Sequence, residues 1–146
     1  YEVSAYSFKV KERSTLPKKH YACDLGMMNA LNTKATADLG ARLETLVFLH
    51  LQRMKKNIFY LKSTEYDIDF AISEDRKIKT LIQVCFSIND EKTRKREFGS
   101  LLKASKKWNS NHLIIVTWSD YEKVDFDGTS IQVLPAWLFC LESRNS

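Results

Sequence analysis

Acidic and polar side chains that could take part in chemistry occur in three successive segments of the sequence. The first is Glu44, the second is the segment YDIDFAI with Asp67 and Asp69, and the third is KTLIQVCF with Gln83 and Cys85. Carboxylates hold hard divalent cations, whereas Gln83 offers only a neutral carbonyl oxygen. A thiol is a nucleophile only beside a base, and the spacing indicates none, so we expect Cys85 to be a small core residue.

An amphipathic helix over residues 38–56 is expected to position Glu44. Its apolar face recurs at helical spacing and comprises Leu39, Leu43, Leu46, Val47, His50 and Met54. Asp38 is a suitable N-cap. Glu44 then lies at the border of the apolar arc, roughly 100° from its centre.

A β-hairpin is expected to position the other polar residues. Alternation over residues 66–72 predicts that Asp67 and Asp69 share one face, opposite Tyr66, Ile68, Phe70 and Ile72. Over residues 79–86, Gln83 and Cys85 share the face that is opposite Ile82, Val84 and Phe86. The polar residues 73–77 between these segments predict antiparallel neighbours.

The remaining pattern predicts an α/β class with a mixed β-sheet flanked by helices. Residues 91–108 form a second expected helix, whose buried face is Phe98, Leu101, Leu102, Ser105 and Trp108. The apolar run at 112–118 and the segment at 130–134 are expected strands. The predicted order is helix, three strands, helix, two strands.

One compact domain is expected, because the sequence shows neither repeats nor low-complexity stretches. It comprises residues 38–146, with an N-terminal lead-in, residues 1–37, packing on it. The lead-in is expected to hold short strands at 2–10 and 19–24 and a helical turn from Met27 to Leu31. Because the chain begins with Tyr1, we expect it to be a piece of a longer protein.

The composition is that of a globular domain, with 44% hydrophobic and 28% charged residues. No apolar run approaches the ~18 residues of a membrane span, and the start lacks a secretory h-region, so no membrane partner is expected. Cys23, Cys85 and Cys140 are spaced for neither a zinc site nor a redox pair, which favours a reducing cytoplasm.

Basic residues concentrate in the second expected helix. The net charge is +5, and residues 92–107 contain seven Lys or Arg against the single acid Glu97. A basic surface favours polyanions, and phosphate contacts are expected at Lys92, Arg94, Arg96, Lys103 and Lys107. Four of these form one stripe on the helix, namely Lys92, Arg96, Lys103 and Lys107. An ordinary solvated helix face is the alternative.

The three tryptophans are expected to be core or interface anchors. They are Trp108, Trp118 and Trp137. Stacking on an unpaired base would need clustered aromatic residues, and the sequence shows no such cluster.

The order of these elements and motifs resembles the PD-(D/E)xK, or restriction-endonuclease-like, nuclease fold. The residues that carry the resemblance are Gly40-Ala41-Arg42-Leu43-Glu44, Asp67-Ile68-Asp69-Phe70, Leu81-Ile82-Gln83-Val84-Cys85 and Thr93-Arg94-Lys95-Arg96-Glu97. Together with the lead-in segment from His20 to Gly26, they are similar to the nuclease-like C-terminal domain of many prokaryotic AAA+ ATPases of unassigned function. The resemblance covers about residues 18–140.

The resemblance implies a role for each motif position. Asp69 would be the central metal ligand, Glu44 the helix acid, Gln83 the second carboxylate position and Cys85 the lysine position, with Mg²⁺ or Mn²⁺ as the metal. This chain departs from an active nuclease, because Gln83 is neutral and Cys85 supplies no positive charge. A replacement cation is expected at Lys79, Lys62 or Arg94.

We therefore expect a nuclease-fold accessory module of an AAA+ ATPase with a degenerate metal site, which binds nucleic acid or a partner domain. One alternative is an active Mg²⁺- or Mn²⁺-dependent DNA endonuclease with a relocated lysine. Another is a purely structural assembly domain. The resemblance implies DNA, the chain's own N-terminal ATPase domain and an oligomer as partners. It also implies that ATP binds only in that missing domain, because no phosphate-binding G-x-x-x-x-G-K-[ST] motif is present.

Overall fold

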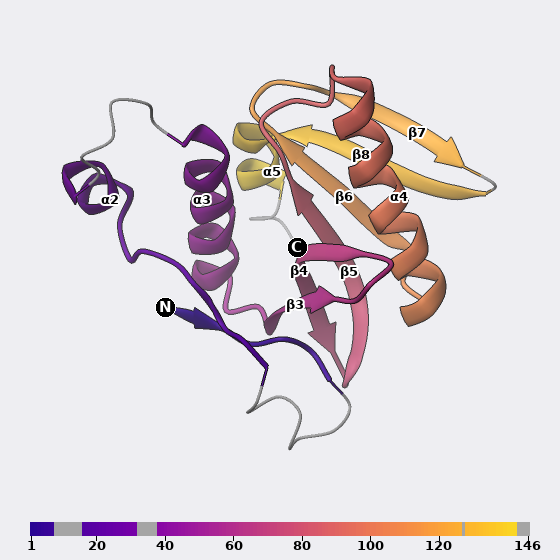
Figure 1. The fold of residues 1–146 in the computed structure, drawn as a ribbon, viewed down its shortest axis with the longest axis horizontal. Helices are drawn as coiled ribbons and strands as arrows, with labels where there is room; N and C mark the ends of the chain where they lie inside the picture. Colours follow the sequence, from indigo (N-terminus) through magenta and orange to yellow (C-terminus); the bar gives the residue numbers. More distant parts are fainter. Residues whose placement is uncertain (8–15, 32–37, 127, 143–146) are drawn as a thin grey trace.

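The computed structural model describes residues 1–7, 16–31, 38–126 and 128–142. Its main sheet has six strands in the order β3-β4-β5-β6-β8-β7 (Figure 1). In chain order these strands are β3 (Ile58–Lys62), β4 (Asp67–Glu74), β5 (Lys77–Val84), β6 (His112–Thr117), β7 (Glu122–Phe126) and β8 (Thr129–Pro135). Strands β3 to β5 form an antiparallel meander, and β5, β6 and β8 run parallel. The predicted mixed α/β class is therefore confirmed.

Helices cover both faces of the sheet. They are α2 (Leu25–Leu31), α3 (Leu39–Arg53), α4 (Glu91–Trp108) and α5 (Ala136–Glu142). One buried cluster joins α3 and α5 to the sheet through Val47, Phe48 and Phe139. A second cluster joins α4 to the opposite face through Phe98 and Leu101. Figure 1 shows α3 and α4 on either side of the strands.

Local sequence signals explain where the two long helices begin. Asp38 is the N-cap of α3 and accepts a hydrogen bond from the backbone N–H of Ala41, as predicted. Asp90 caps α4 in the same way through Thr93. The left-handed residue Asn109 then ends α4, because a residue at positive φ cannot continue a helix. Among the described helices, none combines the length and apolar character needed to cross a membrane.

The hairpin between β4 and β5 is tighter than the sequence predicts. Its loop consists of Asp75 and Arg76, both at positive φ, and Glu74 pairs with Lys77. The predicted order has three strands after the first helix, and the sequence patterns located two of them, β4 and β5. The structure shows that the remaining one, β3, comes before them in the chain. Strand β7 was not predicted, because it is an exposed edge strand in which Val124 is the single aliphatic residue.

The predicted single apolar face of β4 is wrong. Tyr66 and Ile68 pack in the cluster beneath α4, whereas Phe70 and Ile72 pack in the cluster beneath α3. The cause is an irregular register, because Leu61 pairs with Ile68 while Phe59 pairs with Ala71. Strand β4 therefore has one more residue than β3 between these pairs, and the extra residue reverses the alternation.

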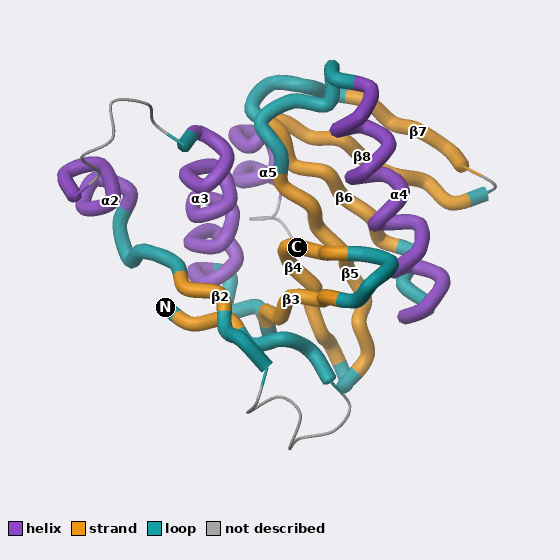
Figure 2. The backbone as a smooth tube through the Cα atoms, viewed as in Figure 1, coloured by secondary structure: helices purple, strands orange, loops and turns teal. Residues whose placement is uncertain are grey.

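The described parts of the lead-in pack on the main domain. Strands β1 (Glu2–Val3) and β2 (Lys19–His20) form a small antiparallel sheet. The backbone of Tyr60 in β3 bonds Ser4 and Tyr6, which ties this segment to the sheet edge. Figure 2 shows the small sheet beside the lower end of α3. The expected strand at 2–10 ends at Val3 among described residues, and its positions 8–10 lie outside them.

Candidate functional site

Asp69 and Glu44, which are far apart in the sequence, are brought together by a lysine from the lead-in. The ammonium of Lys19 in β2 lies 2.9 Å from Oδ1 of Asp69 and 3.1 Å from Oε1 of Glu44. Tyr21 donates its hydroxyl hydrogen to the same Glu44 oxygen at 2.6 Å. The two acids of the predicted motif are thus joined through a protein cation.

The end of the β4–β5 ladder positions Asp69. Regular pairing runs as far as Phe70 and Ile82, and beyond it side chains replace the ladder. The backbone N–H of Asp69 donates to Oε1 of Gln83 at 2.8 Å, and Oδ2 of Asp69 accepts from the backbone N–H of Val84 at 3.0 Å. Both carboxylate oxygens of Asp69 therefore have protein donors.

Gln83 connects this acid pair to α4. Its side-chain amide donates to Oε2 of Glu97 at 2.6 Å, and Glu97 also accepts from Nε of Arg96 at 2.9 Å. Gln83 and Glu97 are 4% and 5% exposed. The amide thus links the backbone N–H of Asp69 to the carboxylate of Glu97, which explains how a neutral residue is satisfied in this buried position.

The charges in this network are unequally stabilised. Burial and the neighbouring charge of Glu44 raise the pKa of Asp69 to about 6, although Lys19 acts in the opposite direction. Burial opposes the charged form of Lys19, but the carboxylates of Asp69 and Glu44 outweigh it and raise the pKa of Lys19. Burial and Glu44 raise the pKa of Tyr21, so its hydroxyl remains a donor.

Cys85 lies on the predicted face of β5 but has no reactive character. It is 8% exposed and belongs to the apolar cluster beneath α4. Burial, reinforced by Glu97 and Asp120, raises the pKa of its thiol to about 12. The prediction that Cys85 fills core space is confirmed.

The predicted replacement cations lie elsewhere. Lys62 pairs with the exposed Asp67 at 3.4 Å. Arg94 donates two hydrogen bonds to Glu122 of β7, at 2.7 and 2.8 Å. Lys79 lines a different cavity, at the opposite end of β5. The cation that neutralises Asp69 is instead Lys19, which corrects the sequence-based expectation.

The network borders a cavity of about 300 Å³ between α3, β4, β5 and α4. Its lining is Glu44, Asp67, Asp69, Gln83, Val84, Arg96, Glu97 and Ser100. Within the part of the chain that the structure describes, no three His, Cys, Asp or Glu side chains are grouped so that they could hold a metal ion. The donor set gives the same result, because Lys19 already occupies the space between Asp69 and Glu44. The residues present do not fit a hard divalent cation.

The basic stripe on α4 is exposed as predicted. Lys92, Lys103 and Lys107 are solvent-exposed, and the Arg96 side chain is 70% exposed while it pairs with Glu97. Arg96 and Ser100 also line the polar cavity. The stripe therefore continues along α4 from the edge of that cavity, whereas Arg94 is directed toward Glu122 and lies off the stripe.

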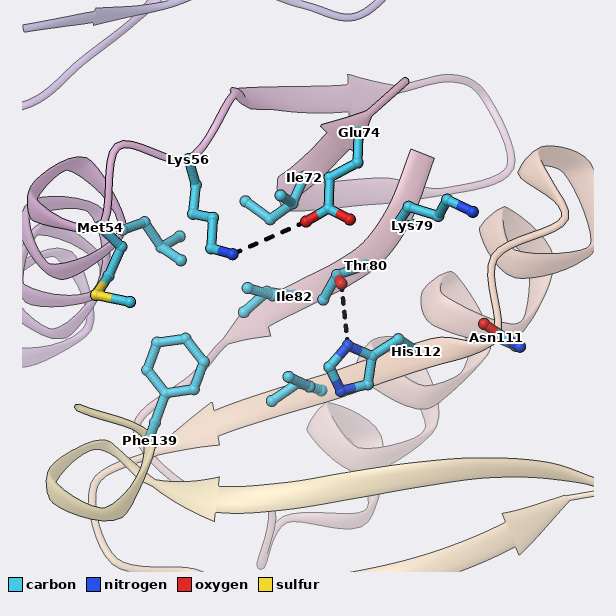
Figure 3. Close-up of a pocket in the computed structure, with 12 residues that line it drawn as sticks. Met54, Lys56, Ile72, Glu74, Lys79, Thr80, Ile82, Asn111, His112 and Phe139 are labelled. Atoms are coloured by element: carbon cyan, nitrogen blue, oxygen red, sulfur yellow. Dashed lines mark hydrogen bonds and ion pairs between the residues drawn. The ribbon is translucent and has the colours of Figure 1, made fainter. Parts of the chain in front are cut away.

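A second cavity of about 340 Å³ lies at the other end of β5 (Figure 3). Its floor is apolar and includes Ile72, Ile82 and Phe139. Two polar pairs flank it, as the dashed lines in Figure 3 show: Lys56 with Glu74 at 3.8 Å, and Thr80 with His112 at 3.0 Å. None of the four motif positions lines this cavity.

Sequence reasoning missed Lys19, Tyr21 and Glu97 as parts of the site. Lys19 contacts Asp69 across 50 positions in the sequence, so no local pattern could reveal it. Glu97 offered a weak signal, because it is the single acid among the seven basic residues of positions 92–107. Its role follows only from the direction in which α4 packs.

The chain is similar to two curated proteins, both uncharacterised. It is 34% identical over 145 residues to a protein of Methanocaldococcus jannaschii, covering 92% of this chain and 32% of the relative. It is 25% identical over 138 residues to a protein of Haemophilus influenzae, covering 94% of this chain and 33% of the relative. The chain thus spans about a third of the length of these relatives. No protein-family model and no solved structure matches it.

Proposed function

We propose that this chain is a nucleic-acid-binding module on a nuclease-like core, in which an internal lysine occupies the acidic site. The observation that carries the proposal is the Lys19 ammonium between Asp69 and Glu44. A cation at this position satisfies the two acids without metal. Within the proposal, a divalent cation could bind both acids only after Lys19 had left them.

The order of elements supports the resemblance to the PD-(D/E)xK fold. A helix, an antiparallel three-stranded meander, a second helix and a parallel strand follow one another in α3, β3 to β5, α4 and β6. Asp69 and Gln83 lie side by side in this arrangement. The second carboxylate of such a site is replaced by Gln83, whose amide is engaged by Glu97.

The exposed stripe on α4 supports the binding half of the proposal. Four cations at helical spacing match the regular charge of a phosphate backbone, and phosphate contacts supply most of the affinity in sequence-independent binding. Within the proposal, the stripe holds the backbone while Arg96 stands at the entrance of the polar cavity.

A larger assembly is part of the proposal. The relatives are about three times as long as this chain, and the resemblance implies an AAA+ ATPase domain in the remainder. ATP binding, oligomerisation and docking on this module would belong to that longer protein. Coexpression of the ATPase region with this chain, followed by copurification, tests the docking.

A charge-reversal pair tests DNA binding. Lys103→Glu with Lys107→Glu removes two stripe cations, whereas Lys95→Glu with Lys106→Glu makes the same charge change on the flank of the same helix. If four phosphates are contacted, the slope of log K against log salt for duplex DNA is about −3.6 and falls to about −1.8 in the stripe variant. Equal losses in both variants contradict a localised stripe. Absence of salt-dependent binding by the unmodified chain favours a purely structural domain.

A cleavage assay tests the part of the proposal that says the chain does not hydrolyse nucleic acid. The chain, Asp69→Asn and Lys19→Met are incubated with supercoiled plasmid and single-stranded DNA in Mg²⁺ and in Mn²⁺. We expect no cleavage by the unmodified chain. Cleavage that disappears in Asp69→Asn would instead establish the metal-dependent endonuclease, with Lys19 as the relocated lysine to be examined.

A further inference from the structure

Two exposed aromatic rings are stacked at the edge of the sheet next to the candidate site. The rings of Phe86 and Trp118 lie 5.8 Å apart with an interplanar angle of 17°. Phe86 is 42% exposed and Trp118 is 59% exposed. This pair corrects the expectation that no aromatic residues cluster. Trp118 is also outside the core.

The backbone holds the two rings in register. Phe86 follows β5 and Trp118 follows β6, and Figure 2 shows the loops after these parallel strands at the same edge of the sheet. The backbone N–H of Trp118 donates to the carbonyl of Phe86 at 3.0 Å, and that of Cys85 donates to Val116 at 3.1 Å. These bonds continue the ladder beyond the strands, so the ring pair is preorganised.

The ring pair lies close to the polar cavity. Val84, whose N–H binds Asp69, precedes Phe86 by two residues, a separation of roughly 7 Å in extended chain. Helix α4 begins shortly after Phe86, and its exposed Lys92 and Arg96 lie in the first two turns. The aromatic pair is therefore within a few residues of the cavity-lining Val84 and of the start of α4.

The acids near the ring pair are engaged by the protein itself. Asp90 caps α4, Asp120 accepts the backbone N–H of Ile88 at 2.8 Å, and Glu122 holds Arg94. The charge of Glu122 is offset by Arg94, whereas Asp90 and Asp120 keep their negative charge because their donors are neutral N–H groups. Lys92 and the guanidinium of Arg96 remain exposed in the first two turns of α4 as cations for the phosphates of a bound strand.

We propose that Phe86 and Trp118 form a stacking platform for an unpaired nucleobase, so that the module prefers single-stranded nucleic acid or a strand end. This inference rests on the proposed nucleic-acid binding and names its substrate class. A base extends an offset ring stack through its π-face, which a base pair inside a duplex does not expose to a protein. The phosphates that follow the stacked base lie on the stripe.

Fluorescence anisotropy with three labelled DNAs tests the platform on the purified chain. The probes are a 12-nucleotide oligothymidylate, the same strand with abasic sites in place of bases, and a 12-base-pair duplex. Trp118→Ala is expected to weaken binding of the oligothymidylate about 10-fold, because stacking on one base is lost. Its binding of the abasic strand and the duplex should stay within twofold. Trp118→Phe, which keeps a π-face, should restore most of the affinity.

Trp137→Ala is the matched control, because Trp137 is also exposed, at 63%, and is in no stacked pair among the described residues. Equal weakening of all three probes by Trp118→Ala overturns the platform, as does unchanged binding of all three, which would assign the rings to a protein contact. These outcomes leave the proposed function intact if the charge-reversal pair still weakens binding. If the unmodified chain binds none of the probes, both proposals are overturned.

Discussion

The two cavities at opposite ends of β5 differ in how their walls are stabilised. At one end, Gln83 and its neighbours form a polar network in which every charged group has a protein partner. The other cavity extends toward the start of β5, where Lys79 and Thr80 line it, and its floor, which includes Ile82, is apolar with polar pairs at the rim. Gln83 and Ile82 are adjacent, and alternation along the strand directs them to opposite faces.

The difference shows what each kind of cavity requires. A polar cavity lined by buried carboxylates needs cations or other donors from the protein, because an unpaired buried carboxylate is costly. Lys19 and Arg96 supply those charges here. The apolar cavity needs no such partners, and its integrity depends on packing alone.

The largest expected effect is at the apolar end. Ile82→Ala removes a side chain that is 1% exposed and should lower the free energy of unfolding by about 3 kcal/mol, through lost burial and an enlarged cavity. Urea denaturation measures the change. A loss below about 1 kcal/mol would mean that the surrounding residues collapse into the space. The apolar cavity would then not depend on close packing as the comparison with the polar cavity requires.

The next effect is at the polar end. Gln83→Leu keeps the volume but removes the acceptor for the Asp69 N–H and a donor to Glu97, so we expect a loss of about 2 kcal/mol. Ser100→Ala, which alters the lining of the same cavity, is the control and should change stability by less than about 0.5 kcal/mol. Similar values for both variants would show that the network contributes little.

Asp69 gives this end a pH dependence that the apolar end lacks. Its pKa is raised to about 6 from an ordinary value of 3.8, so the folded state binds more protons than the unfolded state between these values. Stability contributed by Asp69 is therefore present at low pH and is lost as the pH rises from about 4 through 6, with a slope of at most about 1.4 kcal/mol per pH unit. Thermal melts across this range should show the decline, and Asp69→Asn should flatten it. If stability instead rises with pH across this range and Asp69→Asn removes the rise, folding lowers the pKa of Asp69, which contradicts the raised value.

The smallest effect is expected outside the network. Lys62 and Asp67 form an exposed pair, with side chains 69% and 56% exposed. Lys62→Ala should change the free energy of unfolding by less than about 0.5 kcal/mol, because solvent screens such pairs. If calorimetry instead gives a loss as large as that of Gln83→Leu, Asp67 belongs to the network after all.

Most elements of the fold follow from local sequence signals. The apolar spacing and Asp38 predicted α3, and the short apolar run at 112–118 predicted β6 to within one residue at its end. The exceptions have physical reasons. The irregular register near Asp69 reversed the faces of β4, and β7 lacked an apolar pattern because one of its edges is unpaired.

The candidate site was predictable in part. The positions of Glu44, Asp69 and Gln83 in successive elements followed from periodicity and order, and the structure places these residues in one network. The stacked pair of Phe86 and Trp118 could not be predicted, because the two residues meet only when β5 and β6 lie parallel. Their separation in the sequence conceals their contact.

The sequence by itself determined the α/β class, the two long helices, the exposed basic stripe and the uncharged residues Gln83 and Cys85 on one face of β5. These properties depend on residue type and on spacing within one element. Only the tertiary structure showed that Lys19 lies between Asp69 and Glu44 and that Glu97 holds Gln83. The reason is that electrostatic neutralisation depends on distances of a few ångströms between elements, and packing sets those distances.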